Sequence, residues 1–176
     1  NPTTINSRRN DNAIALVIGV ANYSRAPAAI FADNDANVFS DFARRAFGVP
    51  QNNIKLLVND KASLTDTKVA VKRWLRGRIE EGVSDVYVFF AGHGLASPDG
   101  NDLYLLPFDG APSLLEETAL FRRELFDVVS QAKPRSATIF LDTCYSGLSR
   151  CRGIVVTPKS QSIPSGFTVL SAASGQ

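Results

Sequence analysis

The sequence predicts a doubly wound α/β fold, in which a mostly parallel sheet is covered by helices on both faces. Two observations in its 176 residues lead to this prediction. Short apolar runs alternate with longer segments of helical periodicity. The first of these runs, residues 13–20, is continuously aliphatic and β-branched, which is typical of strands buried on both faces of a parallel sheet. With 44% hydrophobic and 20% charged residues, the chain is expected to bury one core and form one domain.

The first half of the chain is predicted to form two strands, each followed by a helix. Residues 13–20 form a continuous aliphatic run, and residues 54–58 repeat this short apolar pattern. Residues 32–48 begin with acidic and amide side chains and carry apolar residues three and four apart, which predicts an amphipathic helix. A second helix is predicted over residues 64–81, with Gly82 as its stop. Its apolar side is expected to comprise Val69, Val71, Trp74, Leu75 and Ile79.

The second half continues this alternation. Residues 85–91 and 137–141 are predicted to form two further main strands, and the helical segment 124–132 precedes the second of them. Two other apolar runs, 103–107 and 167–170, are long enough only for strands. Strands and helices joined by brief turns in this order complete the doubly wound pattern.

Two chemically reactive residues directly follow predicted strands. His93, the only histidine, lies between two glycines after one strand, and Cys144, one of two cysteines, follows another. In doubly wound folds ligands bind at the carboxyl edge of the sheet, where both residues are expected to lie. An imidazole beside a thiol favours the thiolate and later protonates a leaving amine. The pair therefore predicts a cysteine nucleophile with a histidine partner, and the backbone amides of Gly94 and Cys144 are candidate donors to a developing oxyanion.

Four segments together resemble the caspase-like peptidases, and most closely their metacaspase and bacterial orthocaspase branch. The sequences at 90–94 (FAGHG) and 141–147 (LDTCYSG) resemble the histidine and cysteine motifs of that family. The sequences at 16–23 (LVIGVANY) and 34–36 (NDA) resemble its first strand and the following helix start. The histidine precedes the cysteine by about 50 residues, as in caspases. The resemblance covers residues 13–175 and implies a caspase-like three-layer sandwich, of which the chain would be the large-subunit portion.

The resemblance implies hydrolysis of peptide bonds through a thioester, with Cys144 as nucleophile, His93 as general acid and base, and proteins or peptides as substrates. Asp142 occupies a position where caspases proper have glutamine. A carboxylate in the specificity pocket favours a cationic side chain. The branch it resembles uses aspartates matching Asp142 and Asp35 to cut after arginine or lysine, so Arg or Lys is expected at P1. For Asp35 a capping role at its helix start is the alternative.

No cofactor or metal is predicted. The paired aspartates with which calcium-dependent metacaspases bind their ion would fall near residues 121–124, where the chain has arginines, and a further one would fall near Cys151. Calcium needs several oxygen ligands, so these positions argue against calcium dependence. Ala91 stands where the branch has a serine, which removes one expected pocket contact.

The predicted organisation has four parts. Residues 1–12 form an N-terminal extension, and residues 13–147 form the caspase-like catalytic domain. Residues 148–166 form an exposed linker, and residues 167–176 contain a final strand at the start of a small-subunit-like region. The resemblance therefore implies a small-subunit chain or a C-terminal continuation as a partner.

The linker is a candidate activation loop. It lacks periodicity and contains serines and prolines, which predicts an exposed segment. Its basic residues Arg150, Arg152 and Lys159 are candidate self-cleavage positions if the enzyme prefers basic P1 residues, and simple solvated loop charges otherwise.

Other classes of function are less well supported. A net charge of +2 spread along the chain gives no reason to expect a nucleic-acid partner, and no stretch approaches the length of about 18 apolar residues that a membrane span needs. Two cysteines do not make a disulfide framework, which favours a reduced thiol and a cytoplasmic location. A nucleotide-binding domain is disfavoured because no glycine-rich phosphate loop follows a strand. A catalytically inactive caspase-like scaffold remains the alternative to the peptidase.

Overall fold

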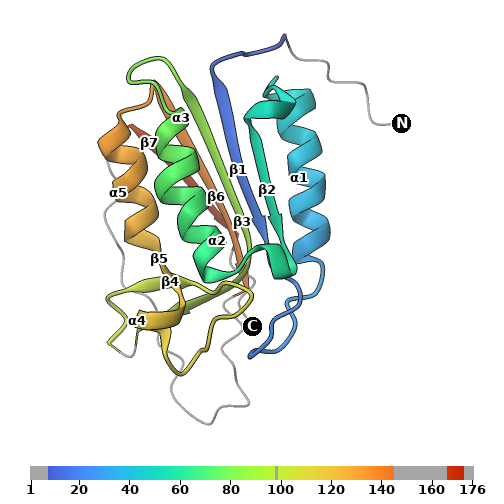
Figure 1. The fold of residues 1–176 in the computed structure, drawn as a ribbon, viewed down its shortest axis with the longest axis vertical. Coiled ribbons are helices and arrows are strands. Elements are labelled where there is room, and N and C mark those ends of the chain that lie inside the picture. The colour runs from blue at the N-terminus through green and yellow to red at the C-terminus, as the bar shows by residue number, and fades with distance from the viewer. Residues whose placement is uncertain (1–7, 98, 145–165, 173–176) are drawn as a thin grey trace.

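The computed structural model describes residues 8–97, 99–144 and 166–172. A central sheet separates two helical layers (Figure 1). Helix α1 (Ala32–Ala46) covers one face. The other face is covered by α5 (Arg122–Ala132) and by a continuous helical segment composed of α2 (Leu64–Val69), the π-helical η3 (Ala70–Leu75) and α3 (Arg76–Arg78). The predicted three-layer α/β arrangement is confirmed.

The sheet is mixed and mostly parallel. Five parallel strands lie in the order β2 (Ile54–Val58), β1 (Ala13–Gly19), β3 (Asp85–Ala96), β6 (Ser136–Cys144) and β7 (Phe167–Ala172). Two short antiparallel strands, β4 (Leu103–Leu105) and β5 (Leu120–Phe121), continue the sheet from the carboxyl end of β3. A parallel strand needs a crossover connection, and described helices lie in the connections from β1 to β2, from β2 to β3 and from β3 to β6.

Strand β1 is buried along its whole length, as its uninterrupted aliphatic sequence predicts. Its alternate residues divide between two apolar cores: Leu16 and Ile18 pack toward the layer of α2 and α5, and Val17 packs toward α1. At the end of the strand, Gly19 lets α1 approach closely, because a Cβ there would lie 2.4 Å from the Cβ of Ala36. The sheet and α1 are thus packed most tightly at the end where α1 begins.

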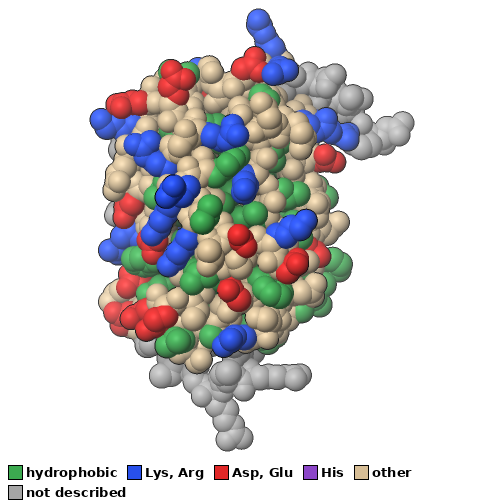
Figure 2. All heavy atoms as spheres, viewed as in Figure 1, with side chains coloured by type: hydrophobic (Ala, Val, Ile, Leu, Met, Phe, Trp, Pro, Cys, Tyr) green, Lys and Arg blue, Asp and Glu red, His purple; other side chains and the backbone are tan. Residues whose placement is uncertain are grey.

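The surface formed by α2, α3 and α5 carries charges of both signs. Lys and Arg side chains lie over α2, α3 and α5 with Asp and Glu side chains between them (Figure 2). Lys72 of η3 forms an ion pair of 2.7 Å with Glu124 of α5, and Lys133 forms one of 3.2 Å with Glu81. None of the described helices is long and apolar enough to cross a membrane.

The second predicted helix is confirmed in most of its apolar side, and the prediction is wrong at its end and at Val69. It ends at Arg78, whereas the prediction carried it to Glu81, and Val69 is 49% exposed although it was placed on the apolar side. Val69 lies two residues, or about 200° of helix rotation, from Val71, so it faces away from the sheet. A π-helical turn follows it, in which the amide of Arg76 bonds back to Val71, five residues earlier. The side that packs on the sheet comprises the predicted Val71 and Leu75 together with Thr67 and Ala70.

Strand β3 is longer than predicted. It was expected to end at Ala91, but it continues through His93 to Ala96, because β4 pairs with its last three residues in an antiparallel ladder. The short helix α4 (Leu115–Thr118) and β5 were not predicted at all. The remaining predicted strands and helices are present with small shifts of their ends.

Candidate active site

The register of the sheet brings the two predicted catalytic positions side by side. Strands β3 and β6 run parallel, and His93 is the direct register partner of Cys144. Two residues earlier, Ala91 pairs with Asp142 on one side and with Gly19 of β1 on the other. The backbone of Cys144 is the last described part of β6, and its side chain lies outside the described residues. The expectation that the histidine and cysteine segments meet at the carboxyl edge is confirmed for the backbone.

His93 is held in a defined environment and is only 5% exposed. Its ring stacks on Tyr23, with ring centroids 4.8 Å apart and an interplanar angle of 28°. Its Nε2 lies 2.8 Å from the backbone carbonyl oxygen of Pro27. A carbonyl oxygen only accepts hydrogen bonds, so Nε2 must carry the proton in this contact. In the neutral ring Nδ1 is therefore the basic nitrogen.

The two glycines that flank His93 make room for protein side chains. Gly92 has φ +147°, and a Cβ there would lie 2.5 Å from the hydroxyl oxygen of Tyr23. A Cβ on Gly94 would lie 2.9 Å from the Cβ of Thr143, which is buried in the neighbouring strand β6. Close packing of Tyr23 and Thr143 around the histidine therefore gives a structural reason for glycine at both positions.

The connection between β1 and α1, residues 20–31, supplies both contacts of the histidine ring, and it is itself fixed in place. The side-chain oxygen of Asn59 accepts hydrogen bonds from the backbone amides of Ala21 and Asn22, at 2.9 and 3.0 Å. The amide of Ser24 donates to the carbonyl of Phe108 at 2.9 Å. The connection that contains Tyr23 and Pro27 is thereby tied to the segments that follow β2 and β4.

The two predicted pocket carboxylates lie within each other's electrostatic influence. Asp35 is half-buried in the first turn of α1, and Asp142 is half-buried on β6. Burial raises the pKa of Asp142 above its ordinary value, and the negative charge of Asp35 raises it further. Neither carboxylate belongs to an ion pair among the side chains that the structure describes. The charge of Asp35 thus acts on Asp142, and the role of both residues in a substrate pocket stays a prediction.

Other predicted positions are not among the residues grouped around His93 and Asp142. Arg150, Arg152 and Lys159, the candidate self-cleavage positions, lie outside the described residues. In the region considered for calcium, Arg123 lies in the first turn of α5 and forms an ion pair of 3.6 Å with Asp102. Within the described parts of the chain, no group of three or more His, Cys, Asp or Glu residues could hold a metal ion.

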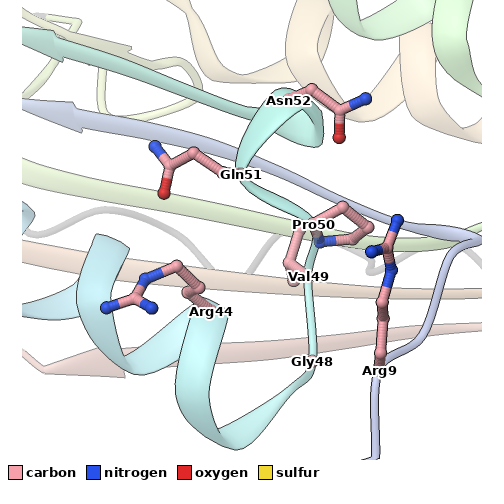
Figure 3. A pocket seen from close by; sticks show the side chains of 7 residues that line it. All are labelled: Arg9, Arg44, Gly48, Val49, Pro50, Gln51 and Asn52. Carbon is pink, nitrogen blue, oxygen red and sulfur yellow. The ribbon is translucent and has the colours of Figure 1, made fainter.

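A cavity of about 490 Å³ lies at the opposite end of the sheet from His93 (Figure 3). It is lined by the segment that follows α1, including Gly48 and Val49, and by the side chains of Arg9 and Arg44. Both arginines form ion pairs with nearby aspartates, Asp11 and Asp41. The cavity is therefore separate from the residues of the candidate active site.

The fold has three layers, and its sheet places a histidine and a cysteine position in register at the carboxyl edge. These features are typical of domains that resemble cysteine peptidases. The caspase domain family matches residues 12–176, and the chain belongs to this family. The resemblance at the motif level is thus confirmed for the family.

Solved structures agree on the fold. The chain is similar to pro-sf-caspase-1, with 13% identity and a TM-score of 0.58, over 97% of this chain and 64% of that one. It is also similar to protein GSU0716 from Geobacter sulfurreducens, with 19% identity and a TM-score of 0.57, over 77% of this chain and 52% of that one. The chain therefore spans between half and two thirds of the length of these structures. No curated protein sequence matches it.

Proposed function

We propose that this chain is part of a cysteine endopeptidase of the metacaspase or orthocaspase branch that cleaves peptide bonds after arginine or lysine. The observation that carries the proposal is the direct register pairing of His93 with Cys144 at the carboxyl edge of the sheet, in a chain of the caspase domain family. The proposed nucleophile is the thiolate of Cys144, and the proposed acid and base is the imidazole of His93.

The proposed reaction follows from the tautomer of His93. With Nε2 donating to Pro27, Nδ1 takes the proton of the Cys144 thiol, and the sulfur attacks the carbonyl carbon of the scissile bond. The amides of Gly94 and Cys144 are the proposed donors to the resulting oxyanion. Collapse of this intermediate breaks the C–N bond, and His93 returns the proton to the leaving amine. Water then attacks the thioester, its proton passes to His93, and the acid product and free thiol are released.

The preference for basic residues follows from the electrostatics of Asp142 and Asp35. Burial and the negative charge of Asp35 raise the pKa of Asp142, and neither carboxylate has an ion-pair partner among the described side chains, so a cation that enters beside Asp142 would stabilise its charged form. An arginine or lysine side chain of the substrate supplies that charge, whereas an aspartate would add a third negative charge. In this proposal the position of Asp35 in the first turn of α1 serves both the helix and the pocket.

We further propose that the enzyme is made as a zymogen and cuts itself within residues 148–166. Arg150, Arg152 and Lys159 match the basic preference and are the proposed cleavage positions. A small-subunit chain or a C-terminal continuation would complete the domain, and the substrates would be proteins or peptides. The reaction needs neither calcium nor another cofactor, and a free thiolate suits a reducing, cytoplasmic setting.

The direct test compares cleavage of a fluorogenic peptide with arginine at P1 by two variants. Cys144→Ala should abolish turnover, because it removes the nucleophile. Cys151→Ala is the matched control, since it removes the other cysteine of the chain, and should retain turnover. Turnover that survives in Cys144→Ala would contradict the proposal.

A second candidate is a caspase-like interaction module without catalysis. It is compatible with the same family match, which covers residues 12–176 and identifies the domain without showing catalysis. An activity probe with a basic P1 residue and an electrophilic group distinguishes the two candidates. Labelling that depends on Cys144 supports the peptidase, and absence of labelling in the full protein with its partner chain supports the interaction module.

A further inference from the structure

The end of β3 changes partners at the histidine. Its pairing with β1 stops at Ala91, whereas its pairing with β4 begins only at Gly94. Between them the carbonyl of His93 accepts a hydrogen bond from the amide of Leu106 at 3.0 Å. The amide of His93 donates to the hydroxyl of Tyr23 at 2.8 Å. Tyr23 thus provides a backbone contact at a point where β1 no longer does.

We propose that Tyr23 is a positioning residue for His93, whose hydroxyl fixes the backbone of the histidine and whose ring fixes the plane of the imidazole. This inference rests on the proposed function, since it assigns Tyr23 a role in presenting the proposed acid and base. Tyr23 touches neither the substrate nor the reacting atoms in this account, and it acts through His93.

Three contacts act together on the histidine. The Tyr23 hydroxyl holds the main chain, the Tyr23 ring stacks on the imidazole at 4.8 Å, and the Pro27 carbonyl holds Nε2 at 2.8 Å. Tyr23 and Pro27 belong to the same connection, so a shift of that connection would move all three contacts. The stack on Tyr23 holds the ring in the orientation in which Nε2 faces the Pro27 carbonyl, so the stack and the hydrogen bond together favour the tautomer with a basic Nδ1.

Tyr23 is itself held firmly enough to serve this purpose. Its ring packs against all three apolar clusters of the described structure, which meet at this point. Gly92 leaves the space that the hydroxyl occupies, because any Cβ at this position would lie 2.5 Å from the hydroxyl oxygen. A large apolar ring anchors the residue, and its single hydroxyl provides the directional contact. The two contributions can therefore be separated by removing the hydroxyl alone.

The test uses the fact that His93 is the only histidine in the chain. Long-range ¹H–¹⁵N correlation spectra of the ¹⁵N-labelled protein therefore report one imidazole, whether or not the protein is active. The wild type should show the Nε2–H tautomer. Tyr23→Phe keeps the ring and should show a mixture of the two tautomers, because the end of β3 is no longer held against the Pro27 carbonyl. Tyr87→Phe is the matched control, since it removes a hydroxyl from a stacked tyrosine on the same strand, and should leave the spectrum unchanged.

Kinetics provide the second readout. Tyr23→Phe should lower kcat about tenfold with little change in KM, because the proton transfers depend on the orientation of the ring whereas the substrate pocket is left intact. An imidazole spectrum identical to that of Tyr87→Phe would overturn the inference, whatever the activity. A changed spectrum in a protein that cleaves no peptide would support the positioning role of Tyr23 and contradict the proposed peptidase, so the two failures are distinguishable.

Discussion

The two ends of the paired strands β3 and β6 each carry an aspartate, and the two aspartates have opposite surroundings. At the amino end, Asp85 accepts hydrogen bonds from Asn10 and Ser136 at 2.8 and 2.7 Å and from both Nε and Nη2 of Arg135. Hydrogen bonding to Arg135, helped by Ser136 and Asn10, lowers the pKa of Asp85 to about 2 despite burial. At the carboxyl end, burial and Asp35 raise the pKa of Asp142.

This difference in surroundings indicates that Asp85 has a structural role and that Asp142 is suited to binding a cation. Asp85 is satisfied within the protein and joins β3, β6 and the segment before β1. Asp142 has no ion pair among the described side chains and faces a like charge. Buried charges without a partner are costly, and such groups are concentrated at functional sites. The contrast predicts that neutralising Asp85 harms the fold and that neutralising Asp142 harms recognition.

The largest expected effect is on substrate choice. Asp142→Asn should lower kcat/KM for a peptide with arginine at P1 about 100-fold, because a buried charge pair with the substrate is lost. Cleavage kinetics of matched peptides with arginine and with a neutral P1 residue would measure this effect. Asp60→Asn, at an exposed aspartate, is the control and should leave both rates unchanged. An unaltered P1 profile in Asp142→Asn would contradict the assigned pocket.

The next effect is on stability at the other end of the strands. Asp85→Asn should reduce the free energy of unfolding by about 2 kcal/mol, because it weakens the charge-assisted bonds from Arg135. Urea unfolding at pH 7 would measure it. The P1 profile of the folded variant should be that of the wild type. A changed profile would contradict the purely structural role assigned to Asp85.

A smaller effect is expected in the connection that supports His93. Asn59→Ala removes the acceptor of the Ala21 and Asn22 amides, which should cost about 1 kcal/mol of local stability. Hydrogen exchange should become faster at these two amides and remain unchanged in the centre of β1. Equal acceleration throughout β1 would show that Asn59 supports the whole sheet instead of this connection.

The sequence was most informative where physical constraints depend on residue type. The aliphatic run of β1 predicted a strand buried on both faces, and the rare His93 and Cys144 located the site. The contact of His93 with Pro27 could not be predicted, because it uses a backbone carbonyl that every residue has. The π-helical turn in 70–75 carries no proline or glycine to mark it, so this turn could not be predicted. The continuation of β3 depends on pairing with β4, which is a tertiary effect.

The smallest expected effect is that of Asp142 on stability, and its sign is opposite to that of Asp85. Asp142 has a raised pKa in the folded state, so its ionisation disfavours folding, and this penalty is present at neutral pH and disappears as pH falls toward 3.8. Asp142→Asn should therefore raise the Tm slightly at pH 7 and leave it unchanged near pH 3. Asp85 stabilises the fold above its ordinary pKa of 3.8, and this stabilisation is lost as pH falls from there toward about 2. The Tm of Asp85→Asn should accordingly converge with that of the wild type on acidification, and thermal unfolding of both variants between pH 2 and 7 measures both trends. A fall in Tm for Asp142→Asn at pH 7 would show that Asp142 stabilises the fold as Asp85 does, and the contrast between the two ends would not hold.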